Sequence, residues 1–108
     1  MKFIIHSSEC FDKWLDDLKD RQARIAILKR IERAAKGNLG DCKPIKGDNG
    51  KGLYEMRIDF GPGYRIYYGK MASAIYLLIS GGIKKHQDRN IATAKSLWAE
   101  LRYDEFQD

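Results

Sequence analysis

The feature that most constrains the fold is a run of alternating residues from Leu53 to Gly69, interrupted once by Gly61-Pro62-Gly63. Apolar side chains at every second position indicate strands with one buried face. Two glycines and a proline between two such strands favour a reversal of the chain. We therefore predict a β-hairpin with strands over residues 53–60 and 64–69. The expected apolar face consists of Tyr54, Met56, Ile58, Phe60, Tyr64, Ile66 and Tyr68.

The length of the turn sets the register of this hairpin. A three-residue turn would place Arg57 opposite Tyr67 and Asp59 opposite Arg65. Arg57 and Arg65 would then be diagonal neighbours on the polar face, roughly 7–8 Å apart between their Cα atoms. Two arginines and a tyrosine on one face can hold a phosphate group. On the strands alone, an ordinary solvated face is the simpler interpretation.

The residues before the hairpin predict one strand and two helices. A short apolar run predicts a strand over residues 2–6. Apolar residues at helical spacing predict helices over residues 8–18 and 21–36, with Gly37 ending the second. Residues 37–51 are rich in glycine and lack periodicity, so we expect a long loop of the kind that is usually functional or mobile. The expected N-caps are Ser7 or Ser8 for the first helix and Asp20 for the second.

The residues after the hairpin predict a turn, a third strand and a last helix. The turn is expected at residues 69–72 and the strand over residues 73–80. This strand is almost continuously apolar, as expected where helices cover both faces of a sheet. Gly81-Gly82 is expected to end it, and the last helix follows with Asp88 or Asn90 as its N-cap.

These elements together predict the fold class. A chain of 108 residues is long enough for one domain and too short for two, so we expect a single domain over residues 1–108. The order is strand, two helices, three strands, helix. It predicts an α+β fold with a largely antiparallel sheet packed by helices. Residues 103–108 are polar and are expected to fray.

Composition narrows the classes of partner and compartment. The formal charge is +5 and the isoelectric point is near 9.2, which favours nucleic acid or an acidic peptide as partner. Cys10 and Cys42 lack CxxC spacing, so we expect reduced thiols rather than a disulfide framework or a metal site. No stretch approaches the roughly 18 apolar residues of a membrane span, and the N-terminus lacks the apolar core of a secretory signal. We expect a cytoplasmic protein without a membrane partner.

The basic residues that follow Gly82 are expected to converge with the polar face of the hairpin. No cluster of Cys, His, Asp and Glu has the spacing of metal ligands, so we expect neither a metal nor another cofactor. A basic and aromatic face suits RNA cleavage by transesterification. A base removes the 2′-hydroxyl proton, arginines stabilise the pentacovalent phosphate, and an acid protonates the leaving 5′-oxygen. The candidate residues are Arg57, Arg65, Tyr67, Lys84, Lys85 and His86.

Individual residues in this set suit different tasks. Guanidinium donors match phosphate oxygens, and Tyr67 is expected to stack on a splayed RNA base. Histidine exchanges protons near neutral pH, which makes His86 the candidate for proton transfer. A lone histidine beside a helix start is nevertheless more often a surface residue. Lys46 is expected to fold back from the long loop toward the sheet and, with Lys85, to bind RNA.

Two stretches of the sequence resemble a known family. They are GLYEMRIDFGPGYRIYYG and YLLISGGIKKHQDRNIATAKSLW. Both resemble the RelE/ParE superfamily of type II toxins, in particular the addiction module killer proteins grouped with HigB. The resemblance covers essentially the whole chain. It implies a RelE-like βααβββα fold and a toxin neutralised by a cognate antitoxin encoded beside it. In the RelE and HigB branches the toxin enters the ribosomal A site and cuts mRNA, which implies a metal-independent endoribonuclease that inhibits translation.

The resemblance also implies site residues. Positions matched here by Arg57, Arg65 and Lys84 carry the site in that branch, with Lys85 as a near alternative to Lys84. Glu55 departs from the pattern, because RelE has a second lysine there.

The start of the last helix departs as well. RelE has a tyrosine in this segment, where this chain offers His86, Gln87 and Asp88. We therefore expect His86 to serve as the general base. Two alternatives remain open. The ParE branch shares the fold and inhibits DNA gyrase, and a non-catalytic relative would only bind an antitoxin.

Overall fold

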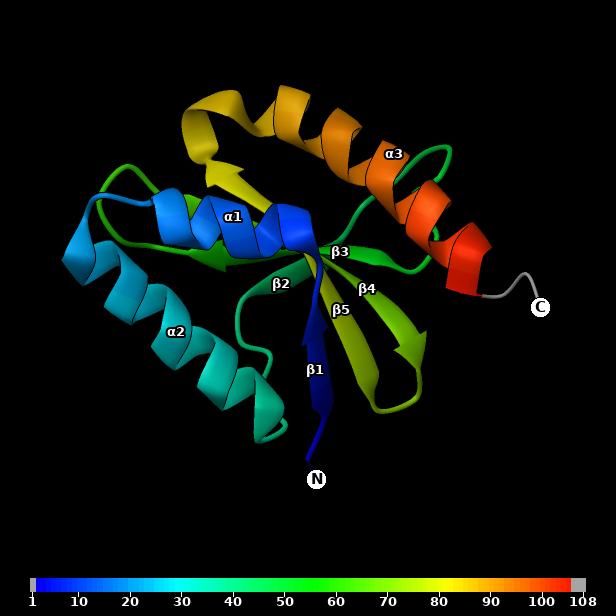
Figure 1. The fold of residues 1–108 in the computed structure, drawn as a ribbon, viewed down its shortest axis with the longest axis horizontal. Coiled ribbons are helices and arrows are strands. Elements are labelled where there is room, and N and C mark those ends of the chain that lie inside the picture. The colour runs from blue at the N-terminus through cyan, green and yellow to red at the C-terminus, as the bar shows by residue number, and fades with distance from the viewer. Residues whose placement is uncertain (1, 106–108) are drawn as a thin grey trace.

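The computed structural model describes residues 2–105, and the side chains of residues 2–101. The elements are β1 (Ile4–Ser7), α1 (Glu9–Asp17), α2 (Arg21–Ala35), β2 (Cys42–Pro44), β3 (Leu53–Ile58), β4 (Tyr64–Ala72), β5 (Ile75–Ile83), the short 3-10 helix η1 (Lys84–His86) and α3 (Gln87–Glu105). The strands form one sheet in the order β1-β5-β4-β3-β2 (Figure 1). β1 runs parallel to β5, and the remaining pairs are antiparallel. The α+β fold class with a largely antiparallel sheet is confirmed.

The two N-terminal helices begin where their caps predict. The Ser8 hydroxyl oxygen accepts a hydrogen bond from the Phe11 backbone N–H at 3.1 Å and donates one to the Ile79 carbonyl at 2.6 Å. Asp20 accepts from the backbone N–H groups that open α2. These side chains satisfy N–H groups that have no partner inside the helix. Ser8 also fixes α1 to the sheet, because its second bond reaches β5.

The sheet carries a hydrophobic cluster on each face. α1 and α2 cover one face, and α3 covers the other (Figure 1). Trp98 is 1% exposed at the centre of the α3 side, and Trp14 packs against the cluster on the α1 side. Both tryptophans therefore contribute to the hydrophobic core. The α3-side cluster is formed by Leu53, Tyr67, Ile79, Ala94 and Trp98.

The register of the hairpin differs from the prediction. β3 ends at Ile58, two residues earlier than expected, and the connection to β4 spans residues 59–63. Within it, the Gly63 N–H donates to the Phe60 carbonyl at 2.9 Å, which closes a tight turn and leaves residues 59 and 60 outside the ladder. Arg57 consequently lies directly opposite Arg65, where a three-residue turn would have made them diagonal neighbours.

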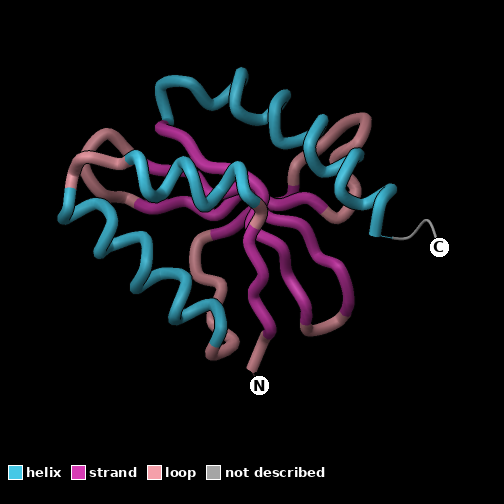
Figure 2. The backbone as a smooth tube through the Cα atoms, viewed as in Figure 1, coloured by secondary structure: helices cyan, strands magenta, loops and turns pink. Residues whose placement is uncertain are grey.

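The long loop contains a strand that the sequence pattern does not reveal. β2 has three residues, ends in proline, and forms the sheet edge by pairing with β3. After it, the segment 45–52 runs beside α3 (Figure 2). The Trp98 indole N–H donates to the Lys51 carbonyl at 2.9 Å and anchors this segment.

The predicted turn at residues 69–72 and the predicted break at Gly81-Gly82 are wrong. β4 continues to Ala72, and β5 continues through both glycines to Ile83. An added Cβ on Gly81 would lie 2.4 Å from the Trp14 ring, and one on Gly82 would lie 1.9 Å from Asn90 Nδ2. The glycines therefore permit the close approach of α1 on one face and α3 on the other, while the strand continues.

The last helix starts without the expected side-chain cap. η1 leads directly into α3 at Gln87, so Asp88 and Asn90 lie inside the helix. α3 runs to Glu105, beyond the predicted start of a frayed tail at Tyr103, and residues 106–108 lie outside the described residues. Among residues 2–105, no helix has the length and apolar character needed to cross a membrane.

Candidate functional site

The polar side of β3 and β4 is organised around Glu55, whose side chain is 1% exposed. Its Oε1 lies 3.5 Å from Arg57 Nε and 3.9 Å from Arg65 Nε. Like charges directly opposite each other in a sheet are destabilising, and a buried carboxylate requires partners. The Glu55 carboxylate therefore forms ion pairs with both arginines, and the three side chains form one charge cluster.

The start of α3 is joined to this cluster by Gln87. The Gln87 side-chain Nε2 donates a hydrogen bond of 2.8 Å to Glu55 Oε2. Glu55 thus faces the arginines with one oxygen and α3 with the other. Arg65 is fixed further by a 3.1 Å hydrogen bond from its Nη1 to the Tyr64 carbonyl.

Three of the predicted residues converge on one pocket. Arg57, Arg65 and Lys84 line a cavity of about 190 Å³, here called the arginine pocket. Lys84 reaches it because its backbone N–H donates to the Gly63 carbonyl at 2.8 Å, which holds the end of β5 against the hairpin turn. The remaining lining residues are Asp41, Asp59 and Gly63.

Arg30 of α2 holds the backbone next to the arginine pocket. Its guanidinium donates hydrogen bonds to the backbone carbonyls of Arg57, Leu39 and Asp41. The Arg57 backbone N–H also donates to the Asp41 carbonyl at 2.9 Å. Arg30 therefore ties α2 and the segment before β2 to the strand that carries Arg57. The helical periodicity of α2 gave no sign of this, since Arg30 is one of several arginines there.

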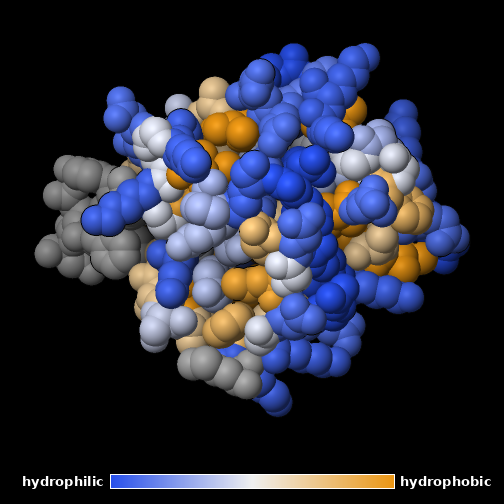
Figure 3. Space-filling model, turned by 180° about the vertical axis from the view of Figure 1, so that it is seen from behind, coloured by the Kyte–Doolittle hydropathy of each residue, from blue (hydrophilic) through white to orange (hydrophobic). Residues whose placement is uncertain are grey.

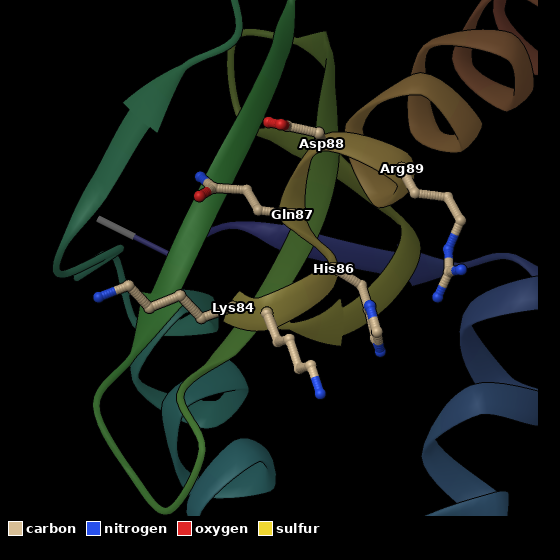
Figure 4. Close-up of a pocket in the computed structure, with 6 residues that line it drawn as sticks. Lys84, His86, Gln87, Asp88 and Arg89 are labelled. Carbon is tan, nitrogen blue, oxygen red and sulfur yellow. The ribbon is translucent and has the colours of Figure 1, made fainter.

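His86 lies near Lys84 and does not line the arginine pocket. It lines a hollow of about 330 Å³ that is formed by residues 84–89. Figure 4 shows Lys84 and Gln87 extending to one side of this segment, and His86 and Arg89 extending to the other. The predicted proton-transfer residue therefore lies outside the lining of the arginine pocket, and Lys84 lines both spaces.

Lys46 lies at a third cavity. This side cavity has a volume of about 250 Å³, and Glu55 and Gln87 also line it. Lys46 therefore reaches the neighbourhood of the cluster, as expected from its position at the end of the loop. The other lining residues are Lys43, Pro44, Ile45 and Ile91.

Tyr67 lies beneath the surface. Its side chain is fully buried in the α3-side cluster and lies opposite Glu55 in the ladder. Burial and the adjacent Glu55 carboxylate raise the pKa of the Tyr67 phenol well above its usual range. A ring in this position has no free face, so the stacking role predicted for Tyr67 is incompatible with the structure.

Acidic residues near the cations are the part of the site that the sequence pattern did not single out. Asp41 and Asp59 are exposed carboxylates on the rim of the arginine pocket. Across residues 2–105, no group of three or more His, Cys, Asp and Glu side chains is placed to hold a metal ion. The site therefore combines fixed cations with carboxylates, a set that can bind a phosphate and accept a proton.

The surface opposite the view of Figure 1 is mostly hydrophilic. Figure 3 shows apolar residues there in separate small areas among polar ones. The larger exposed apolar side chains are Ile4, and Ile25 with Leu28. Ile25 and Leu28 are neighbours on the surface of α2, because they lie three residues apart in the helix.

Sequence comparisons identify a family and a relative of this chain. The family model described as "Phage derived protein Gp49-like (DUF891)" matches residues 13–100. An uncharacterized protein of Haemophilus influenzae is 40% identical over 101 residues, which cover 94% of this chain and 98% of that protein.

One solved structure has a similar fold, and a second gives a weaker match. A chain of the toxin–antitoxin complex RelBE2 from Mycobacterium tuberculosis superposes with a TM-score of 0.61 at 13% identity, covering 78% of this chain and all of that one. A conserved hypothetical protein of Helicobacter pylori gives a TM-score of 0.45 at 16% identity, covering 79% of this chain and 98% of that one.

Proposed function

Since this chain belongs to the Gp49-like family of phage-derived proteins (DUF891) and has a RelE-like fold, we propose that it is the toxin of a type II toxin–antitoxin system. In this proposal it is an endoribonuclease that cleaves mRNA on the ribosome, and therefore acts in the cytoplasm. The proposal draws on the likeness to the RelBE2 toxin–antitoxin complex and on the residues of the arginine pocket.

The convergence of Arg57, Arg65 and Lys84 on one pocket carries the proposal. Two guanidinium groups and an ammonium group provide donors that match the oxygens of a phosphodiester. Glu55 holds both arginines before any substrate arrives, so little reorganisation is needed when charge develops on the phosphate. Fixed donors of this kind usually provide the largest part of transition-state stabilisation.

The reaction is a transesterification at phosphorus. The 2′-oxygen loses its proton to a base and bonds to phosphorus, and the bond to the 5′-oxygen breaks. Arg57 and Arg65 stabilise the additional negative charge on the pentacovalent phosphate, and Lys84 donates a proton to the leaving 5′-oxygen. The products are a 2′,3′-cyclic phosphate and a free 5′-hydroxyl.

The proton acceptor is assigned to the rim carboxylates. Asp41 and Asp59 line the same pocket as the arginines, whereas His86 extends to the opposite side of its segment (Figure 4). A general base must lie within hydrogen-bond reach of the proton that it removes. We therefore place proton transfer on Asp59 or Asp41 in preference to His86, and assign Lys85 to the path of the RNA backbone.

The proposed partners follow from charge and family. A cognate antitoxin would neutralise the toxin, and its acidic groups would complement the formal charge of +5. The ribosome and its mRNA form the target, and both present dense arrays of phosphates. Attraction of this kind steers association and weakens as salt is added.

Expression without an antitoxin tests the function. Growth should stop, and primer extension should show cuts within translated codons. Intact message together with accumulated gyrase–DNA breaks would replace the proposal with inhibition of DNA gyrase. Normal growth with intact message would leave a protein that only binds an antitoxin.

A further inference from the structure

The side cavity adjoins the arginine pocket, and the Glu55 carboxylate stands between them. Glu55 lines the side cavity, while its Oε1 lies 3.5 Å from Arg57 Nε in the arginine pocket. Its Oε2 accepts from Gln87, which also lines the side cavity. One buried side chain therefore contacts the lining of both spaces.

The walls of the side cavity suit a flat aromatic ligand. Pro44, Ile45 and Ile91 provide apolar surface, and Lys46 is exposed at the rim. Glu55 and Gln87 provide the polar groups. Small-molecule sites typically combine a mostly apolar lining with a few fixed polar groups. The cavity, at about 250 Å³, has apolar residues beside Lys43 and the other polar groups of its lining, whereas the arginine pocket is lined by charged residues and one glycine.

We propose that the side cavity is a nucleobase subsite, which takes the base of the nucleotide whose phosphate lies in the arginine pocket. The inference rests on the proposed function, since it takes the arginine pocket as an RNA phosphate site. A nucleotide carries its base and its phosphate on one sugar, so the spaces that receive them must adjoin. Glu55 and Gln87 bring the two spaces together.

The polar groups of the subsite favour a base with an exocyclic amino group. Gln87 uses one Nε2 hydrogen on Glu55, which leaves its Oε1 as an acceptor. The ionised Glu55 side chain offers acceptors only. Adenine, cytosine and guanine present an amino group with two hydrogens to such acceptors, whereas uracil presents only its single ring N3–H. Lys46 can donate to a ring nitrogen or carbonyl of the same base.

Titration of the purified protein with small ligands tests the subsite. The probes are the four nucleoside 3′-monophosphates, with ribose 5-phosphate as the ligand that lacks a base. Backbone amide NMR signals of Arg65 and Lys84 should shift with every probe. Signals of Lys46 and Ile91 should shift only with nucleotides, and most strongly with those that carry an amino group. Equal shifts from ribose phosphate and from nucleotides, or no shift at Lys46 and Ile91, would overturn the proposal.

A matched pair of variants tests the role of Gln87. Gln87→Leu should weaken binding of the amino-bearing nucleotides by roughly three- to tenfold, the effect of one lost hydrogen bond, and should weaken binding of uridine monophosphate less. Gln22→Leu is the control, because Gln22 is exposed on α2. An equal loss for all four nucleotides would show that Gln87 supports the site without reading the base, and would overturn the base preference.

The outcome is separable from that of the proposed function. Base-dependent binding with intact mRNA in the cell would leave the subsite in place and remove the ribonuclease. Cleavage of mRNA with no base-dependent shift at the side cavity would leave the ribonuclease in place and remove the nucleobase subsite.

Discussion

The side-chain amide of Gln87, in the first turn of α3, donates a 2.8 Å hydrogen bond to Glu55 in the middle of β3. These residues are far apart in the sequence, and the bond fixes where the last helix starts relative to the hairpin. It also directs the second Glu55 oxygen toward Arg57 and Arg65. The geometry of the arginine pocket therefore depends on a residue that does not line that pocket.

Glu55→Gln should lower the free energy of unfolding by roughly 3 kcal/mol, because removing one partner of a buried ion pair leaves the other charge uncompensated. The low end of the usual range is expected, since Arg57 is partly exposed. Urea unfolding measures the change. Glu32→Gln is the control, because the Glu32–Lys36 pair is exposed and such pairs contribute little. Similar effects of the two substitutions would contradict the structural role of Glu55.

Arg65→Ala should reduce mRNA cleavage by on the order of a hundredfold or more, the usual cost of losing a fixed donor to the transition state. Arg65→Lys should recover part of the rate, because it keeps the charge and loses the planar donors. Primer extension after a short induction measures both. Arg24→Ala, an exposed arginine on α2, should cut like the parent protein. Full activity in a folded Arg65→Ala protein would remove the arginine pocket from the reaction.

His86→Gln should leave the cleavage rate near that of the parent protein, because His86 extends away from Lys84 and Gln87 (Figure 4). Asp59→Asn should slow cleavage by roughly a hundredfold if Asp59 is the proton acceptor, and Asp41→Asn tests the other rim carboxylate in the same assay. A large loss in His86→Gln with both aspartate variants active would return proton transfer to the histidine.

Tyr67→Phe should preserve cleavage, because the buried ring has no free face for RNA. It should also change the alkaline stability. Burial and Glu55 raise the pKa of Tyr67 in the folded protein, so above the ordinary tyrosine pKa of about 10 the unfolded chain loses this proton first. The free energy of unfolding then falls as pH rises, by up to about 1.4 kcal/mol per pH unit for one group.

The free energy of unfolding of the Tyr67→Phe variant should fall less steeply with rising pH, by that amount. Urea unfolding at several alkaline pH values measures the slope. The same slope in both proteins would show that Tyr67 is not protected from ionisation in the folded state.

Gly81→Ala should destabilise the protein by roughly 1–3 kcal/mol, the usual cost of forcing extra volume into a packed core. The new Cβ would lie 2.4 Å from the Trp14 ring. Combining it with Trp14→Leu should cost less than the sum of the single changes, which thermal unfolding of the four proteins would show. Additive effects would mean that the glycine does not serve the approach of α1.

Local signals in the sequence located most of the elements. Alternation identified the hairpin, and Ser8 and Asp20 marked the starts of α1 and α2. Three features depend on contacts that no local pattern contains. β2 is a strand only because β3 pairs with it, and the hairpin register depends on the Phe60–Gly63 hydrogen bond. Gly81 and Gly82 signal either a break or a close approach, and only the packed helices distinguish these.

The candidate site was predictable only in part, because its geometry also depends on contacts between residues that are far apart in the sequence. The cations Arg57, Arg65 and Lys84 followed from alternation and family resemblance, and the structure brings them together. Glu55 was seen as a departure from the family pattern, and the structure places it at the centre of the cluster. Tyr67 was assigned to an exposed face because nothing local shows that α3 covers that part of the sheet.

The parallel pairing of β1 with β5 has a consequence for biosynthesis. Ile4 pairs with Ile75, so the first strand has no partner until β5 has been translated and has left the ribosome. Pairing across such a sequence separation is slow compared with local folding. The arginine pocket needs the same late segment, since Lys84 follows β5 directly. A nascent chain therefore carries no complete arginine pocket before synthesis of the domain is nearly finished.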